Sequence, residues 1–478
     1  MIYEDLNLLP KKIPTIIIGS GPAGIATALT LEKKGHSSLI LEAGNFSQNE
    51  DDLNFLRVQN YGDKYADLEF ARLRQFGGTS GNWGGNCSAF SRIEIEEWGI
   101  DYEDFQKNYE DAKKILNIKK DFYIDKLSPE LNLFNVIWSN VQFGKKYKNY
   151  LIKSKRIHLA LNTTFDHFTG EDGMISSAIC INKNNTAPII GNNYILSCGG
   201  IENSRLLLIS KKRNKKLFPF EDAPIGNYYF DHPKREVGKG ILNVFNFNKF
   251  LKNNLISNKP NLDCENLNFS FNHDFLQKIK IYNSAFFLRI KREVFKTEIL
   301  KNIHILKCIA PKYVGRLFEK NNQNDLIEFN LSIFQEQNSV KENRITLSDL
   351  YDKNKMEKSK VYWKLSKSFF NDAKVAINSL SDYFIKNDIG RIAISDIFLG
   401  GEPKMTVGNH QMGGTRIGKS KSESVVDTNL CVHGFRNLYI NGSSVFKNGG
   451  VCFPTFTIVQ LACRLGQYLS KKYEAQFK

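Results

Sequence analysis

His410 is the residue whose type and surroundings best suit proton-transfer chemistry. It lies in Gly408–Gly418, which reads GNHQMGGTRIG, so glycines and small polar residues surround an imidazole. Imidazole titrates near neutral pH and can accept a proton from a substrate hydroxyl. The alternative interpretation is a packed, hydrogen-bonded histidine with a structural role only.

A phosphate-binding turn is predicted near the other end of the chain. A β-branched apolar run leads into GSGPAG at residues 19–24, a GxGxxG pattern that opens a helical stretch. Gly19 would permit the tight turn, Gly21 would let the backbone approach a pyrophosphate, and Gly24 would let the helix pack on the strand. Glu42 ends the next apolar run, 18 residues beyond Gly24, near the spacing of a ribose-binding carboxylate. These features predict dinucleotide binding, and a glycine-rich turn in an α/β core is the alternative.

A second glycine-rich loop follows. Residues 77–85 hold five glycines, with a tryptophan among them. Backbone without side chains is typical of places where a large flat group lies close. The loop therefore indicates a cofactor with a second aromatic end, and a surface loop is the alternative. Its candidate cofactor contacts are Gly77, Gly78, Thr79, Asn82, Trp83 and Gly84.

Alternating strands and helices must position these residues. Short apolar runs predict buried parallel strands, and helical stretches follow two of them. Aromatic residues at helical spacing predict one helix over Asp101–Leu116, and alternation over Arg156–Asn182 predicts a small antiparallel meander. The expected strands are Ile16–Ile18, Ser38–Leu41, Asn193–Ser197 and Asn437–Ile440, and the expected helices are Ile25–Lys34 and Ile201–Ser210.

The middle of the chain has a different pattern. Motif glycines are absent there, alternating runs predict strands, and a helix is expected near Ser366–Ile385. The fold class is therefore α/β in a two-domain α+β arrangement: a Rossmann-type FAD-binding domain built from both chain ends, with an inserted antiparallel-sheet substrate domain. The expected boundaries are 1–235 and 405–478 for the cofactor domain and 236–404 for the substrate or cap domain.

Composition excludes several classes of protein. The chain has 478 residues, 41% of them hydrophobic, and a formal net charge of +16. No apolar run approaches the roughly 18 residues of a membrane span, and the N-terminus lacks a secretory pattern, so we expect a cytoplasmic protein without a transmembrane segment. The eight cysteines form no CxxC pair or zinc spacing, which predicts no metal. The charge alone indicates no nucleic-acid partner, because no recognition motif accompanies it.

The chain resembles the glucose–methanol–choline (GMC) oxidoreductases, flavoenzymes that oxidise alcohols and sugars. Ordered motifs carry the resemblance: TIIIGSGPAG with Glu42, RQFGGTSGNWGG, YILSCGGIENSRLLL, GNYYFDHP, and NHQMGGTRIG followed by VVDTNLCVHGFRNLYINGSSVF. It implies an FAD-dependent enzyme that oxidises a CH–OH group of a sugar, sugar derivative or other alcohol by hydride transfer to flavin N5. His410 would be the general base, and Gly442, Ser443 and the helix opening at Thr455 would contact the cofactor.

Two residues near the expected substrate side stand out. Phe453 precedes Pro-Thr where the family usually has Asn or His, so a hydrogen-bonding partner of the base is missing. This departure leaves a catalytically weak or silent flavin-binding protein as an alternative. His232, in the Asp-His-Pro segment, is a candidate for substrate contact, with a structural hinge as the other interpretation.

The resemblance also bears on the cofactor's attachment and on its reoxidation. Members with covalent FAD use a histidine in the glycine-rich loop, whereas Asn82 stands in the matching region here, so we expect non-covalent FAD. The sequence leaves oxygen, a quinone or a cytochrome open as the electron acceptor.

Overall fold

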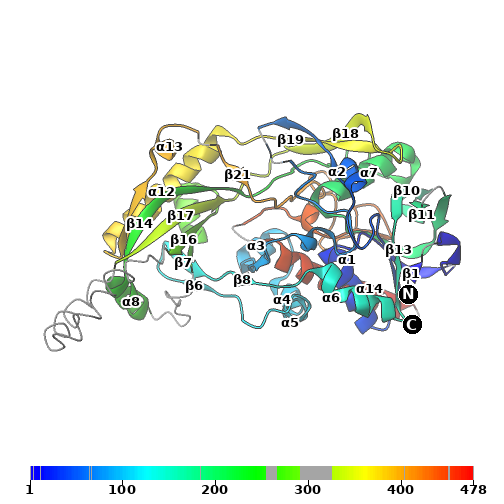
Figure 1. The fold of residues 1–478 in the computed structure, drawn as a ribbon, viewed down its shortest axis with the longest axis horizontal. Coiled ribbons are helices and arrows are strands. Elements are labelled where there is room, and N and C mark those ends of the chain that lie inside the picture. The colour runs from blue at the N-terminus through cyan, green and yellow to red at the C-terminus, as the bar shows by residue number, and fades with distance from the viewer. Residues whose placement is uncertain are drawn as a thin grey trace.

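The computed structural model describes all residues except 1, 4, 11, 64, 66, 183–184, 255–265, 291–325, 403, 451–452 and 477–478. Figure 1 shows two parts side by side: one holds both chain ends around a parallel sheet, and the other is built on a large antiparallel sheet. This arrangement agrees with the predicted fold class.

The part that holds both chain ends is organised by a parallel sheet. Within the described residues it has six strands, and every adjacent pair is parallel. The predicted strands near Ile16, Ser38, Asn193 and Asn437 all lie in it. In spatial order the strands are β1 (Ile2–Tyr3), β9 (Ile157–Ala160), β3 (Ser38–Leu41), β2 (Ile13–Ile18), β13 (Gly191–Leu196) and β22 (Leu438–Ile440).

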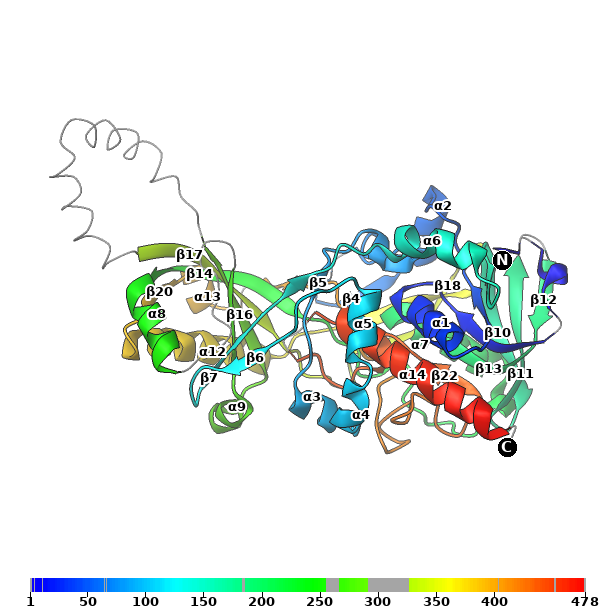
Figure 2. The same cartoon turned by 90° about the horizontal axis from the view of Figure 1, so that it is seen from below.

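Two helices from opposite ends of the sequence pack together beside this sheet. They are α1 (Pro22–Lys33) and α14 (Thr455–Gln476), and Figure 2 shows α14 running from the middle of the molecule to the C-terminal end. Gly466 permits the close approach, because a Cβ there would lie 2.8 Å from Thr30. The chain ends are therefore joined through a helix pair as well as through the sheet.

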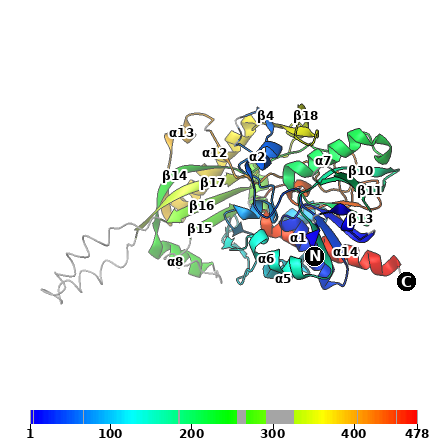
Figure 3. The ribbon, with the colours of Figure 1, turned by 45° about the vertical axis from the view of Figure 1, so that its right-hand side comes forward.

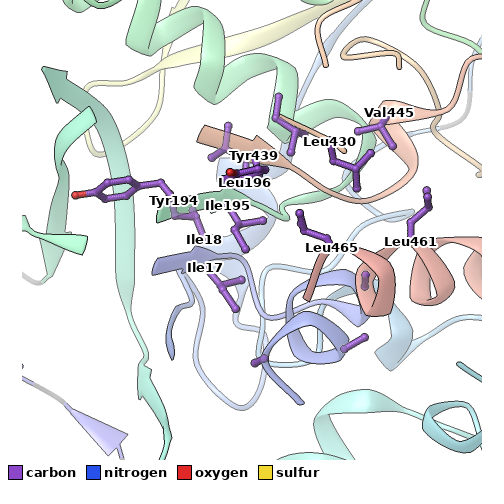
Figure 4. Close-up of a cluster of buried hydrophobic side chains, with 14 of the residues drawn as sticks. Ile17, Ile18, Tyr194, Ile195, Leu196, Leu430, Tyr439, Val445, Leu461 and Leu465 are labelled. Carbon is purple, nitrogen blue, oxygen red and sulfur yellow. The ribbon is translucent and has the colours of Figure 1, made fainter. Parts of the chain in front are cut away.

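The core between the sheet and these helices is apolar and closed. Figure 4 shows side chains of β2, β13 and β22 facing Leu461 and Leu465 of α14. Ile17, Ile195 and Leu461 have no exposed surface. Burial of each such side chain contributes about 1.5–3 kcal/mol, so this core holds head and tail together.

The predicted meander is a separate antiparallel sheet, but it begins later than expected. It comprises β10 (Thr163–Glu171), β11 (Met174–Asn182) and β12 (Asn185–Ile189). The first part of the predicted segment is instead β9, which pairs in parallel with β3. Alternation of apolar residues cannot distinguish these two kinds of strand. Helix α7 (Gly199–Arg213) then follows β13, as predicted.

The second part of the molecule is built on a large sheet in which every strand pair is antiparallel. Figure 3 shows α12 (Lys367–Lys386), the helix predicted near Ser366–Ile385, lying over its strands. Its edge opposite β20 is formed by β7 and β6, two strands that precede the predicted 236–404 segment in the sequence. The eight strands among the described residues are β20 (Gly390–Ile394), β14 (Pro233–Asn243), β17 (Leu326–Gln335), β16 (Ser284–Ile290), β15 (Leu267–Phe271), β7 (Leu131–Phe134), β6 (Ile124–Lys126) and β21 (Thr406–Val407).

Smaller elements connect the two parts. The single helix predicted over Asp101–Leu116 is wrong: α4 (Tyr102–Gln106) ends before α5 (Tyr109–Ile115) begins, because buried Asn108 donates to the carbonyl oxygens of Asp104 and Phe105. The remaining strands are β18 (Arg344–Tyr351), β19 (Glu357–Trp363) and β4 (Gln59–Gly62) in one sheet and β5 (Asn86–Cys87) and β8 (Ile137–Trp138) in another. The remaining helices are α2 (Glu50–Leu56), α3 (Arg92–Glu97), α6 (Phe143–Lys153), α8 (Val244–Asn253), α9 (His273–Ile279) and α13 (Asp396–Leu399), with short 3-10 turns η1 (Leu6–Leu8), η2 (Gly78–Gly81), η3 (Lys215–Leu217) and η4 (Ser443–Val445).

Candidate functional site

A cavity of about 540 Å³ lies where the two chain ends meet. Its volume falls in the range typical of small-molecule and cofactor sites. The predicted site residues that line it come from six separate stretches of sequence. They are Gly19, Gly21, Glu42, Gly78, Thr79, Asn82, Trp83, Gly84, His410, Gly442, Ser443, Phe453 and Thr455.

The β2–α1 turn has the geometry predicted for a phosphate-binding turn. Gly19 has φ +103, and a Cβ there would lie 2.6 Å from the Ser197 carbonyl oxygen. Gly24 supports the turn from behind, because its Cβ would lie 2.0 Å from the Gly19 oxygen. Gly21 faces open space, since a Cβ added there would have no atom within 4 Å, which leaves room for a ligand against the backbone.

Glu42 lies at the carboxyl end of β3 and is almost fully buried. Its Oε2 accepts hydrogen bonds from the Ser20 backbone N–H (3.1 Å) and hydroxyl (2.5 Å), and its Oε1 accepts from the Gly44 N–H (2.8 Å). Burial raises the pKa of Glu42, although these hydrogen bonds oppose the rise. The carboxylate is therefore held rigidly beside the turn, where it can also accept from a ribose hydroxyl.

The second glycine-rich loop lies directly against the first. Gly77 donates its N–H to the Ser20 hydroxyl at 3.1 Å, and a Cβ on Gly78 would lie 3.0 Å from the Gly21 Cα. Gly77 itself packs behind the loop, since its Cβ would lie 2.2 Å from the Gly144 nitrogen. Trp83 anchors the other side by donating Nε1–H to the Val141 carbonyl oxygen at 2.9 Å. Both loops thus line one continuous cavity.

The C-terminal segment forms the third wall. Gly442 has φ +113 and is nearly free of neighbouring atoms on its Cβ side, with Asn203 Nδ2 at 3.8 Å. Ser443 donates its hydroxyl to the Gln411 carbonyl oxygen at 2.6 Å, which ties this turn to the segment that carries His410. Thr455 opens α14, so the first turn of that helix offers unpaired backbone N–H groups at the cavity.

Two orphaned polar atoms test whether this cavity fits a dinucleotide. The Ser197 hydroxyl and the Gln411 side-chain Nε2 are buried without a hydrogen-bond partner, and both residues line the cavity. Buried polar groups normally have partners, so these atoms indicate that a polar ligand completes the site. Together with the open sides of Gly21 and Gly442, they fit the predicted FAD.

Two histidines from distant parts of the sequence meet at the wall of the cavity. Nδ1 of His410 lies 2.9 Å from Nδ1 of His232, and the rings are nearly perpendicular. Nε2 of His232 lies 3.0 Å from the Gly449 carbonyl oxygen, which can only accept, so His232 carries its proton on Nε2. His232 Nδ1 is then an acceptor, and His410 donates to it from Nδ1–H. The free lone pair of His410 is therefore on Nε2.

One carboxylate positions both histidines. Oδ1 of Asp231 accepts from the backbone N–H groups of His232 (2.6 Å), Gly408 (3.0 Å) and His410 (3.1 Å). Oδ2 accepts from the hydroxyl of Tyr65. Asp231 thereby fixes the backbone on both sides of the histidine pair, which is a positioning role.

This network extends into the inserted part of the molecule. Gln337 Oε1 accepts from the Asp231 N–H at 3.2 Å and from the Trp363 indole N–H at 2.7 Å. The Trp363 ring in turn packs edge-on against Tyr65 at 4.9 Å. The residues that hold the histidine pair therefore come from both parts of the fold.

The electrostatics of the pair favour neutral rings. Burial, then the charge of His232, then that of Lys234 lower the pKa of His410 well below its usual value. Burial also lowers the pKa of His232 to about 4. At neutral pH both imidazoles are therefore unprotonated at their acceptor nitrogens, and His410 is in the form that a base requires.

Phe453 lies where a second polar group would otherwise face the base. Its ring packs edge-on against His410, with centroids 5.5 Å apart, and its backbone N–H donates to the Ser88 hydroxyl at 2.9 Å. The side chain offers neither donor nor acceptor, so polar contacts to a substrate hydroxyl must come from His410 or from elsewhere in the cavity.

Most predicted site residues line the cavity, and three do not. Gly24, Gly77 and His232 lie behind its wall and support residues that do, so His232 does not contact the cavity as a substrate-side candidate would. Sequence reasoning did not name several other lining residues as site residues. Thr163, Thr164, Phe165, Lys234 and Asp352 lie outside the quoted motifs, whereas Ser197, Cys198, Gly199, Gly200 and Gln411 lie within them.

Two absences hold for the described part of the chain. No helix among those residues is long and apolar enough to cross a membrane. No group of three or more histidine, cysteine or acidic side chains in the same residues is arranged to hold a metal ion.

Comparison with known proteins gives both a family and a fold. Residues 339–462 match the family described as GMC oxidoreductase. No curated protein matches the chain significantly. A formate oxidase variant from Aspergillus oryzae RIB40, studied for its FAD modification, has a similar fold: TM-score 0.58 and 13% identity over 97% of this chain and 99% of that one.

A second solved structure has the same fold. Pyridoxine 4-oxidase from Mesorbium loti gives a TM-score of 0.60 and 12% identity over 95% of this chain and 99% of its own. At these identities the structures establish the fold alone. The family match confirms the predicted resemblance and supports FAD as the cofactor that the family uses.

Proposed function

We propose that this chain, in which residues 339–462 match the GMC oxidoreductase family, is an FAD-dependent oxidoreductase that oxidises a CH–OH group, with His410 as general base. The carrying observation is the histidine pair: hydrogen bonding to His232 leaves the lone pair of His410 on Nε2 at the wall of the cavity. The substrate would be a sugar, sugar derivative or other alcohol.

The residues that would hold FAD are those whose geometry fits it. Gly19, Gly21 and the first turn of α1 would take the pyrophosphate, and Glu42 would accept from the ribose. The loop at residues 77–85 and the Gly442 turn would lie against the remainder. When bound, FAD would supply the hydride acceptor that alcohol oxidation needs. No histidine stands in the glycine-rich loop, which supports non-covalent FAD.

The base step belongs to His410. As the C–H bond of the alcohol breaks, its O–H proton would move to Nε2, and the resulting imidazolium would still donate Nδ1–H to His232. Asp231 would keep the imidazole in place through the backbone on either side. General-base catalysis of this kind contributes about 10²–10⁴-fold in rate.

Replacement of His410 tests the proposal. His410→Ala should retain FAD but slow anaerobic flavin reduction by an alcohol about 10²–10⁴-fold. The matched control is His273→Ala, on α9 and outside the cavity. Equal reduction rates in the two variants would remove His410 from the base role.

The pH dependence gives a second readout. Because the pKa of His410 lies well below its ordinary value of about 6.5, the wild-type rate with a neutral alcohol should stay constant as pH falls through 6.5. The rate should be lost only at lower pH, where Nε2 becomes protonated. A loss centred at 6.5 or above would contradict a buried, neutral base.

A catalytically silent flavin-binding protein is the second candidate, and Phe453 is the observation that favours it. A ring without donor or acceptor occupies the place beside the base. Anaerobic bleaching of the bound flavin by any alcohol in a broad panel would exclude this candidate. Subsequent exposure to oxygen would then separate an oxidase from an enzyme that uses a quinone or cytochrome.

A further inference from the structure

Three phenyl rings form a wall beside His410, and Phe453 is the one of them that lines the cavity. Phe453 packs against His410 and also contacts Phe334 (5.8 Å between centroids) and Phe287 (6.1 Å). Phe287 and Phe334 lie on adjacent strands, β16 and β17, with centroids 4.7 Å apart. All three rings are only partly buried, whereas Ile333, on the opposite face of β17, is fully buried. Through Phe453, against which the other two rings pack, this wall offers the cavity an apolar, flat contact and no hydrogen bonds.

A lysine stands at the end of this wall. Lys234 is the second residue of β14 and lies directly across from Phe334 in the sheet register. Its Nζ is 5.3 Å from the Phe334 ring centroid, and Lys234 lines the cavity together with His410. Within the described part of the chain, Lys234 forms no ion pair. The acid two residues along its strand, Glu236, is exposed and accepts instead from Asn330 Nδ2 at 3.3 Å.

The positive charge of Lys234 opposes protonation of His410 unless an anion lies beside Lys234. Proton transfer to His410 creates a second cation near Lys234, and like charges in a buried site repel. An anionic group on the substrate would offset this repulsion and give Lys234 a partner. The phenyl wall, by contrast, would leave the hydroxyls of a sugar without partners, which a binding site disfavours.

We propose that the substrate is an alcohol with an apolar, planar body and an anionic group that binds Lys234, with its hydroxyl directed to His410. This inference rests on the proposed function and names its substrate class. The reaction is unchanged: the O–H proton would pass to His410, bound FAD would supply the hydride acceptor, and an aldehyde or ketone would remain. Lys234 binds the anion and takes no part in the transfers.

Four compounds separate the two parts of this inference. The pair 4-(hydroxymethyl)benzoate and 4-(hydroxymethyl)benzamide differs at one group, a carboxylate against a neutral amide, and the pair glucuronate and glucuronamide repeats that difference on a sugar body. The measurement is the rate of anaerobic flavin reduction divided by the apparent Kd. We expect the benzoate to exceed the benzamide about 10- to 100-fold, the usual effect of one charge-assisted contact. We also expect the benzoate to exceed glucuronate.

Variants on one strand assign the effect to Lys234. Lys234→Gln should bring the benzoate-to-benzamide ratio close to one, and Lys234→Arg should keep most of it because the positive charge remains. Lys239→Gln is the matched control, since Lys239 is exposed on the same strand and does not line the cavity. A wild-type ratio near one overturns the anion site, and so does a ratio that Lys234→Gln leaves unchanged. If Lys234→Gln does not fold, the benzoate-to-benzamide ratios of the wild type and of Lys234→Arg decide whether the anion site exists.

Binding without turnover separates this inference from the proposed function. The ligand 4-methylbenzoate has no hydroxyl to oxidise, and its binding can be followed by the change it causes in the visible flavin spectrum. Weaker binding of 4-methylbenzamide, and of 4-methylbenzoate to Lys234→Gln, supports the anion site even if none of the alcohols reduces the flavin. Equal binding of acid and amide overturns the site even if alcohols are oxidised. Preference for glucuronate over the benzoate overturns the apolar body.

Discussion

The histidine pair divides one chemical task between two side chains. His410 faces the cavity, whereas His232 lies behind it and determines which nitrogen of His410 carries the proton. Gly449 makes this arrangement possible, because a Cβ there would lie 2.5 Å from His232 Nε2. We therefore propose a positioning role for His232, and the alternative expectation that it contacts the substrate stays a prediction.

The role of His232 can be tested by keeping or removing its acceptor atom. His232→Leu leaves the Nδ1–H of His410 without an acceptor, and flavin reduction should fall about 10- to 100-fold, as for other lost supporting contacts to a reactive imidazole. His232→Gln can accept through its side-chain oxygen and should restore most of the rate. FAD content and the Kd of a non-oxidisable ligand should be unchanged in both variants. Equal rates for Leu and Gln would contradict the tautomer argument.

At the scale of single residues, sequence reasoning found those that carry a motif. His410, Glu42 and the glycines were predicted because their neighbours in sequence define their surroundings. The partnership of His232 with His410 spans 178 positions, and no local pattern indicates it. The position of Lys234 was missed for the same reason: only the pairing of β14 with β17 brings it beside Phe334.

At the scale of elements, the β2–α1 turn shows how two glycines of one motif differ in function. Gly24 is enclosed by protein atoms, whereas Gly21, with φ −70, faces the cavity. Gly24→Ala should lower the free energy of unfolding by about 1–3 kcal/mol, because the new Cβ would collide with the Gly19 carbonyl oxygen. Gly21→Ala should leave the stability of the apoprotein unchanged or raise it by about 0.4–1 kcal/mol, yet weaken FAD binding.

Thermal unfolding of the apoprotein and FAD titration measure the two effects separately. If both variants lost FAD affinity with no loss of apoprotein stability, the structural role of Gly24 would be wrong. Gly35→Ala is unsuitable as a control, because Gly35 has φ +85 and alanine would be strained there.

Helices and strands were predicted correctly where the apolar residues follow one clear pattern, either an apolar run or helical spacing. The parallel strands, α7 and α12 follow from apolar runs and helical spacing, which depend on local sequence. The helix predicted over Asp101–Leu116 failed because the side chain of Asn108 competes for backbone carbonyls, a contact that apolar periodicity does not report. The prediction that the β9 segment belongs to the antiparallel meander was wrong, because β9 pairs in parallel with β3. Which strands pair depends on the whole sheet and cannot be read from one strand's sequence.

At the scale of the whole molecule, segments from both ends of the chain line the same cavity. Residues from β2, β3, the glycine-rich loop and the start of α14 line it. A ligand that binds the native protein alone stabilises it by RT ln(1 + [L]/Kd), about 2.7 kcal/mol at one hundred times Kd. Removal of FAD should therefore lower the melting temperature, and added FAD should restore it in proportion to the logarithm of its concentration.

A separate experiment reports how the cofactor is attached. Acid precipitation should release FAD into the supernatant, as the absence of a histidine in the glycine-rich loop leads us to expect. Flavin that remains in the protein pellet would contradict non-covalent binding. A melting temperature independent of added FAD would contradict binding at the junction of the chain ends.

The hydrogen bonds that join Asp231 to Tyr65 and Gln337 have a consequence for how the chain could change over evolution. Gln337 follows β17 of the antiparallel part and accepts from the backbone N–H of Asp231, so the proposed substrate part also supports the proposed base. A chimaera that exchanged the antiparallel part for a relative's, without a matching side chain at Gln337, should acquire a new binding surface and lose the alignment of the His410 imidazole. Substrate selectivity and turnover rate should therefore change together. Laboratory evolution toward new substrates should succeed first at positions such as Phe287 and Phe334, whose side chains form no hydrogen bond to Asp231.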